Sequence, residues 1–138
     1  MATYRGSCHC GGVAVEFETP TDPAEIELRE CQCGFCRAHG AVSASDPRGR
    51  IRYVEKRPGA MKRYQFGLKS ADYILCRECG VYLGAVMTED GADVYATTNI
   101  RSYRDRARFT RPPQPAVYEQ EGLETRRARR RQRWTPVG

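Results

Sequence analysis

Residues 31–36 read CQCGFC and place three cysteines within six residues. Two further stretches, CHC at 8–10 and CREC at 76–79, hold the rest of the chain's seven cysteines. Cysteines this close together bridge poorly to each other but converge well on one metal ion. An odd number of cysteines without a visible secretory signal also argues against a disulfide framework. The sequence therefore predicts metal binding, with cysteine thiolates as ligands of Zn²⁺.

Seven ligands divide most simply into four and three. A structural zinc site takes four protein ligands, whereas a catalytic site takes three and leaves one position for water or substrate. The paired stretches supply a closed set that ties the N-terminal strand to the middle of the chain: Cys8, Cys10, Cys76 and Cys79. The remaining stretch supplies an open set: Cys31, Cys33 and Cys36. Either His9 or His39 stays open as an alternative fourth ligand.

Glycine follows two of the cysteine stretches directly. Gly11 comes after Cys10, and Gly80 comes after Cys79. Glycine adopts positive φ without a steric penalty, so the backbone can turn there and direct amide N–H groups at the sulfurs. We expect both glycines to have positive φ.

Alternation of apolar and polar residues predicts a mainly β fold. Residues 12–18 (GVAVEFE) place Val13, Val15 and Phe17 on one face. Further short strands are expected at 26–31, 51–55, 61–66, 72–76, 81–87 and 92–97, separated by turns rich in Pro, Gly and Asp. Strands this closely spaced favour antiparallel sheets. Asn99 is expected to cap a short helix, and residues 110–115 (TRPPQP) to be extended.

The length of 138 residues allows a single domain, and the net charge of +6 comes from one short segment. Residues 126–133 (RRARRRQR) hold six arginines, and without them the charges of the chain balance. We expect a solvated, helical tail; nucleic-acid binding through counterion release is the alternative that the sequence favours less. No apolar run approaches the ~20 residues of a membrane span. No apolar segment of a secretory signal is visible in the first ten residues, so we expect a cytoplasmic protein.

The three cysteine stretches, taken in order, resemble a known family. The segments GSCHCGGVAVEFE, CQCGFCRAHGAV and CRECGVYLGA are similar to those of the glutathione-dependent formaldehyde-activating enzymes, a family that includes the centromere protein V relatives. The terminal RRRQRW is also similar to the ends of many bacterial members. The resemblance implies a small, zinc-containing, antiparallel β-tent domain over residues 1–109. Residues 110–138 are then a Pro-rich connection and an Arg-rich helical tail of the same domain.

The resemblance also implies the roles of the two cysteine sets. The closed set holds a structural zinc, and the open set holds a catalytic zinc that is not always occupied. The implied activity joins glutathione to formaldehyde as S-hydroxymethylglutathione and is classed with the carbon–sulfur lyases. Members often carry histidine beside the central cysteines, where this chain has Glu30 and Gln32. The sequence therefore leaves the thiol and the small carbonyl partner unnamed.

The chemistry of three thiolate ligands agrees with that activity. They give a zinc site a net charge of about −1, which makes the ion a weak Lewis acid that accepts soft sulfur ligands readily. This favours thiol chemistry over hydrolysis. A proton shuttle is also needed, and His39, three residues past Cys36, is the first choice, with Glu30 and Tyr64 after it. The alternative function is a non-catalytic, structural zinc module.

Overall fold

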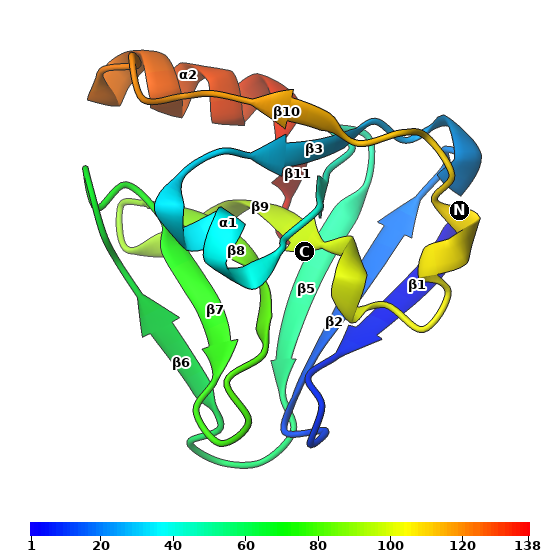
Figure 1. The fold of residues 1–138 in the computed structure, drawn as a ribbon. Coiled ribbons are helices and arrows are strands. Elements are labelled where there is room, and N and C mark those ends of the chain that lie inside the picture. Colours follow the sequence, from blue (N-terminus) through cyan, green and yellow to red (C-terminus); the bar gives the residue numbers. More distant parts are fainter.

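The computed structural model describes residues 1–138 and contains two sheets that lean against each other like the sides of a tent (Figure 1). The smaller sheet has the strand order β1-β2-β5, with β1 at Ala2–Ser7, β2 at Val13–Thr19 and β5 at Arg50–Glu55. The larger sheet has the order β10-β3-β4-β9-β8-β7-β6. Its strands are β3 (Leu28–Cys31), β4 (Ser43–Ala44), β6 (Met61–Tyr64), β7 (Asp72–Cys76), β8 (Tyr82–Glu89), β9 (Ala92–Asn99) and β10 (Gln114–Ala116). The predicted fold class, mainly antiparallel β with a short C-terminal helix, is confirmed.

Strand β2 shows how the apolar alternation builds the core. It is the middle strand of the smaller sheet and pairs antiparallel with β1 and β5. The side chains of Val13, Val15 and Phe17 are fully buried. Glu16, between them in sequence, points to the other face and forms ion pairs with Arg5 and Arg52. The buried face packs between the two sheets, where the main hydrophobic cluster lies.

Two local elements follow from single residues. Asn99 accepts a hydrogen bond from the Arg101 backbone N–H and begins a 3₁₀ turn, η2 (Ile100–Ser102), so the predicted cap is confirmed in a shorter element. Two more 3₁₀ turns are present, η1 (Pro23–Glu25) and η3 (Arg106–Arg108). Helix α1 (Gly34–His39) was not expected from the sequence. Cys33 caps its N-terminus, where the Cys33 sulfur accepts a hydrogen bond from the Cys36 N–H, and Gly40 caps its C-terminus with a φ of 59°.

The Pro-rich segment continues the larger sheet at its edge. The segment is extended as expected, and β10 within it pairs with β3, from Gln114 beside Arg29 to Ala116 beside Cys31. This pairing is parallel, unlike the antiparallel pairs in the rest of that sheet. β10 thereby brings the following chain to the end of β3 that carries a cysteine.

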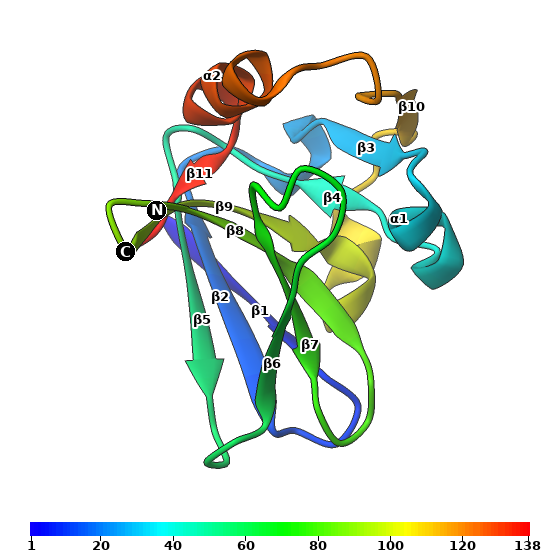
Figure 2. The same cartoon turned by 90° about the vertical axis from the view of Figure 1, so that its left-hand side faces the viewer.

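The Arg-rich tail is helical, as expected, but only part of it is solvated because one face packs on the body. Residues 123–133 form α2 (Leu123–Arg133), which lies above β11 at the top of the molecule and is joined to β10 by a loop (Figures 1 and 2). Arg130 and Trp134 are only 4% and 6% exposed. The chain then ends in β11 (Thr135–Pro136), which pairs with β9. The tail packs because Trp134 is buried against Ala71, Ala85 and Met87, and because acidic residues neutralise several of its arginines. Neither α2 nor any other helix has the length and apolar character needed to span a membrane.

Candidate functional site

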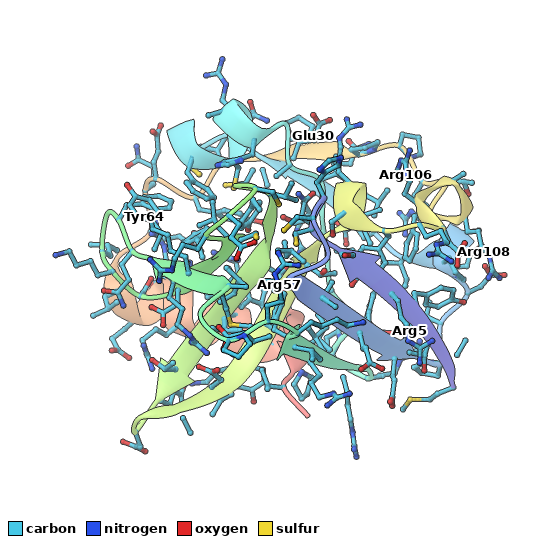
Figure 3. The ribbon with its side chains drawn as sticks, turned by 90° about the horizontal axis from the view of Figure 1, so that it is seen from below. Arg5, Glu30, Arg57, Tyr64, Arg106 and Arg108 are labelled. Atoms are coloured by element: carbon cyan, nitrogen blue, oxygen red, sulfur yellow. The ribbon has the colours of Figure 1, made fainter.

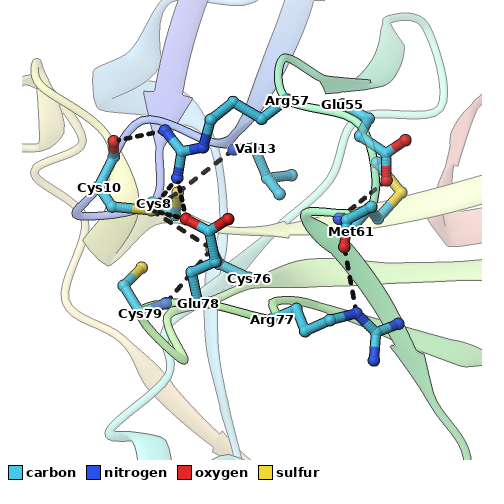
Figure 4. Close-up of polar contacts among 11 residues, drawn as sticks. Cys8, Cys10, Val13, Glu55, Arg57, Met61, Cys76, Arg77, Glu78 and Cys79 are labelled. Atoms are coloured by element: carbon cyan, nitrogen blue, oxygen red, sulfur yellow. Dashed lines mark hydrogen bonds and ion pairs between the residues drawn. The ribbon is translucent and has the colours of Figure 1, made fainter.

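Four cysteines meet where the β1–β2 turn approaches the β7–β8 turn. Cys8 and Cys10 lie in the first turn, and Cys76 and Cys79 lie at the end of β7 and in the second. Gly11 and Gly80, which follow these pairs, have φ values of 84° and 79°, as predicted. The backbone N–H of Val13 points at the Cys8 sulfur at 3.3 Å, and that of Cys79 at the Cys76 sulfur at 3.5 Å. The turns thus direct amide dipoles at the sulfurs (Figure 4).

The sulfur spacing in this cluster suits a tetrahedral ion. The Sγ atoms of Cys8 and Cys10 are 3.7 Å apart, and those of Cys10 and Cys76 are 3.5 Å apart. Zn–S bonds of ~2.3 Å in a tetrahedron require sulfurs about 3.8 Å apart. Arg57 donates from Nη2 to the Cys10 sulfur at 2.8 Å and from Nη1 to its carbonyl at 3.2 Å, and it also pairs with Glu78 (Figure 4). The four sulfurs therefore fit a metal, with a cation beside them.

The three central cysteines lie where β3 joins α1. Cys31 ends β3, Cys33 precedes the first residue of α1, and Cys36 is buried within the helix. Their sulfurs all lie within 4.8 Å of one another, so this cluster also could hold a metal ion. Neither His9 nor His39 belongs to either cluster.

The central thiols differ strongly in acidity. A hydrogen bond with the Cys36 thiol lowers the pKa of Cys31 to about 5, with further help from Cys33 and the charge of Arg129. The same hydrogen bond raises the pKa of Cys36, because Cys36 keeps the shared proton. Cys31 is therefore a thiolate at neutral pH, the form in which cysteine acts as ligand or nucleophile.

Two cavities meet at these thiols. The large cavity, of about 310 Å³, is lined by Cys31 and Cys33, by Phe66 and Val117, and by arginines of α2. The small cavity, of about 50 Å³, is lined by Cys31 and Cys36 together with mostly buried side chains. Five residues line both cavities: Cys31, Tyr73, Tyr118, Arg129 and Arg130. A larger hollow of about 670 Å³ lies over β1 and β2, near Arg5 and Arg106 (Figure 3), and no cysteine lines it.

Aromatic rings form one wall of the site, and α2 forms the other. Phe35 of α1 packs edge-on against Tyr73 and Tyr82, with ring centroids 4.9 and 5.0 Å apart. On the opposite side, Arg129 and Arg130 line both cavities. Sequence reasoning did not find this second wall, because a run of arginines reads the same whether it faces solvent or a cavity. Trp134 was the one available signal, since a lone tryptophan in a charged segment needs an apolar surface.

The structure places the expected proton shuttles outside the two cavities. His39 is exposed on α1, and its ring lies against Phe35 and Tyr82, with centroids 4.5 and 5.6 Å away. Glu30 and Tyr64 are also exposed and lie on separate parts of the surface (Figure 3). None of the three lines a cavity beside the central cysteines. His39 contacts Tyr82, which lines the small cavity, and Tyr64 stacks on Phe66, which lines the large one.

Comparisons with known proteins agree with this arrangement. The family model of the glutathione-dependent formaldehyde-activating enzymes matches residues 3–120. A crystal structure of a Rhodobacter sphaeroides protein, solved as a structural-genomics target, is similar with a TM-score of 0.58 and 28% identity. That similarity covers 80% of this chain and 98% of the other. No curated protein matches this chain. Because the family model spans most of the sequence and both cysteine clusters, the chain belongs to the glutathione-dependent formaldehyde-activating enzyme family.

Proposed function

We propose that this protein joins a small thiol to a small carbonyl compound, in the manner of a carbon–sulfur lyase, at Cys31, Cys33 and Cys36. Glutathione and formaldehyde are the first substrates to consider, since family membership implies them. The observation that carries the proposal is that three thiols, within 4.8 Å of one another, lie where a large and a small cavity meet. A two-chambered site suits a reaction that joins a larger partner to a smaller one.

Zinc fits both clusters as the metal. The closed set, Cys8, Cys10, Cys76 and Cys79, offers four sulfurs near tetrahedral spacing and would hold a structural ion. The open set, Cys31, Cys33 and Cys36, offers three sulfurs and would hold a catalytic ion with one free position. When bound there, zinc would hold the substrate sulfur as its thiolate.

The two cavities would then bind the two substrates separately. The body of the thiol occupies the large cavity, where Phe66 and Val117 give apolar contact and the arginines of α2 attract negative groups. The carbonyl partner occupies the small cavity, among Tyr73, Tyr82 and Trp134. A carbon–sulfur bond forms, the carbonyl π pair moves to oxygen, and the proton lost from the thiol ends on that oxygen. The reverse reaction retraces these steps.

His39 is retained as the proton shuttle of this proposal, acting at the mouth of the site. Its ring contacts Tyr82, and it is exposed, so it can exchange protons with solvent. Because it lies outside the small cavity, we expect His39→Ala to lower turnover only a few fold. A loss above about 100-fold would instead make it the direct donor.

Nothing favours the nucleic-acid alternative. Most arginines of α2 are engaged within the molecule, including Arg126 and Arg129 with Glu121, and Arg127 and Arg131 with Glu89. These contacts hold four of the six arginine side chains against the protein, and Arg130 is buried, so few of them are free to reach phosphates. The experiment must therefore distinguish the proposed enzyme from a structural zinc module without activity.

The test compares Cys36→Ala with the wild type. The variant leaves two ligands at the central cluster, so it should lose about one equivalent of zinc and nearly all thiol-dependent consumption of formaldehyde. Its melting temperature should stay close to that of the wild type, because the closed set is untouched. Arg37→Ala, an exposed position on the same helix, is the control and should keep metal and turnover. A fully active Cys36→Ala protein, or a wild type without metal at this cluster, would favour the structural module.

A further inference from the structure

The small cavity is unusually cationic. Three arginines line it, Arg29 from β3 and Arg129 and Arg130 from α2. No aspartate or glutamate lines it, so the Cys31 thiolate is the one anionic group in its lining. Arg129 has a carboxylate partner outside the cavity, Glu121, which accepts two hydrogen bonds from it, at 2.7 and 3.0 Å. Arg29 and Arg130, in contrast, have no carboxylate partner.

Neither of these two arginines has an acidic partner. Arg130 donates from Nη1 to the carbonyl and the hydroxyl of Ser70, at 3.2 and 2.8 Å, and its buried Nε has no hydrogen-bond partner. Arg29 donates from Nη2 to the hydroxyls of Ser45 and Thr97, at 2.9 and 3.4 Å. Burying a charged group without a group of opposite charge beside it is costly. When mutation removes one partner of a buried ion pair, the charge left behind destabilises the protein by several kcal/mol. With three arginines against one thiolate in its lining, the cavity keeps an excess of positive charge that a further anion would balance.

Both guanidinium groups are held in place before any ligand arrives. Arg130 stacks on the Trp134 ring, with Cζ 4.6 Å from the centroid. Burial lowers its pKa to about 10, so it stays charged at neutral pH. Arg29 is fixed through Ser45, whose hydroxyl donates in turn to the carbonyl of Arg133 at 2.9 Å. Donors that need no reorganisation stabilise developing negative charge most effectively.

The size of the cavity limits the ligand. A cavity of about 50 Å³ holds only a few water-sized atoms, since one water needs roughly 10–15 Å³ by the same measure. Formate, with three non-hydrogen atoms, fits this space, as does the oxygen and carbon of a small aldehyde. A larger anion such as benzoate does not.

We propose that Arg29 and Arg130 form an oxyanion-binding site in the small cavity. The site binds the carbonyl oxygen of the substrate in the reaction proposed above. This catalytic role rests on that proposed function. When the substrate sulfur bonds to the carbonyl carbon, the π pair becomes a lone pair on that oxygen, and the arginines stabilise its negative charge until the thiol proton arrives. Free small carboxylates bind the same site as stable mimics of the charged oxygen.

Formate binding tests the site without requiring turnover. Trp134 is the only tryptophan and lines the small cavity against Arg130, so its fluorescence in the full-length, metal-containing protein reports on the cavity. Formate should change this fluorescence saturably at constant ionic strength, whereas chloride and benzoate should not. Calorimetric titration supplies a second readout, because Arg130 substitutions alter the tryptophan's surroundings.

Substitutions then assign the binding to the two arginines. Arg130→Gln and Arg29→Gln should each weaken formate binding at least tenfold, and Arg130→Lys should weaken it less because it keeps the charge. Arg131→Gln is the matched control: Arg131 pairs with Glu89 at 2.7 Å and does not line the cavity, so affinity should not change. In turnover assays, Arg130→Gln should lower kcat by about 10²–10³ with little change in KM for the thiol.

Two results would contradict the proposed oxyanion-binding site. One is the absence of saturable formate binding to the wild type. The other is equal affinity in the wild type, Arg29→Gln and Arg130→Gln, which would also identify formate held by the metal alone. Failure of the proposed function looks different: formate binding would depend on the arginines while no thiol consumed any aldehyde. Unchanged kcat in Arg130→Gln, with wild-type turnover present, would remove the catalytic role and leave the proposed function intact.

Discussion

The Sγ atoms of Cys10 and Cys76 lie 3.5 Å apart, although 66 residues separate them in the sequence. This contact joins the β1–β2 turn of the smaller sheet to the end of β7 in the larger sheet. A metal shared by these sulfurs would therefore fasten the two sides of the tent at one end. Metal binding and folding should be coupled there, since the unfolded chain cannot assemble ligands from two distant turns.

Replacing Cys76 with serine should show this coupling. The variant should be insoluble or melt at least about 10 °C below the wild type, because loss of a structural metal removes several kcal/mol of stability. Thermal unfolding followed by circular dichroism, with metal content measured in parallel, checks the result. Cys36→Ala is the control, since it removes a thiol from the other cluster. A Cys76→Ser protein that melts like the wild type would show that this cluster has no structural role.

Arg57 should tune metal affinity at the same cluster. Its Nη2 donates to the Cys10 sulfur at 2.8 Å and offsets the negative charge of the thiolates. Arg57→Ala should lower zinc affinity about 10–100-fold, as is usual when a group that supports a ligand is removed. Competition with a chromophoric chelator measures the change. Arg77→Ala is the matched control, because Arg77 lies beside the cluster but donates to the Gly59 carbonyl and not to a sulfur. Equal losses in both variants would refute a specific contact.

Trp134 should anchor the C-terminal helix. Its side chain is 6% exposed and packs with Ala85 and Met87. Trp134→Ala should lower the free energy of unfolding by about 3 kcal/mol, the usual effect of deleting a large buried side chain. Urea denaturation followed by circular dichroism measures it. Leu123→Ala, at the exposed start of the same helix (45% exposed), should change stability by less than about 0.5 kcal/mol. Similar small effects in both would mean that the helix is not docked in solution.

Asp46 should make stability depend on pH. Burial raises the pKa of this carboxyl, but hydrogen bonds from the hydroxyls of Thr19 and Thr21, both 2.6 Å long, outweigh burial and lower it overall. When folding lowers the pKa of a carboxyl, the folded state is stabilised at pH values above the ordinary carboxyl pKa of about 4. This stabilisation is lost as the pH falls through the folded-state pKa.

Asp46→Asn should therefore cost about 1–3 kcal/mol at pH 7, and the difference from wild type should shrink below about pH 4. Denaturant titrations of both proteins at each pH measure the difference in their free energies of unfolding. Any loss of metal at low pH affects both proteins alike and cancels in this difference. Asp105→Asn, at an exposed residue whose side chain makes no capping hydrogen bond, should match the wild type throughout. A pH-independent difference between Asp46→Asn and wild type would disprove the linkage.

Local chemistry in the sequence determined the cysteine clusters, the glycine turns and the strands. The division into two ligand sets followed from spacing and number alone, and Gly11 and Gly80 have the predicted positive φ. The alternation of Val13, Val15 and Phe17 predicted the buried face of β2. These features could be predicted because each depends on residues within a few positions of one another, where covalent geometry and periodicity set the outcome.

Only the tertiary structure decided what surrounds the central cysteines. The sequence gives no sign that Arg29 and Arg130, about a hundred positions apart, line one cavity. Nor does it separate Arg130, which has uncharged partners, from Arg131, which pairs with Glu89. In the sequence both are members of one arginine run, and His39 stands closer to the cysteines than either. The difference arises because β10 and Trp134 dock α2 on the body, and only that packing determines which arginine is desolvated and which remains in water.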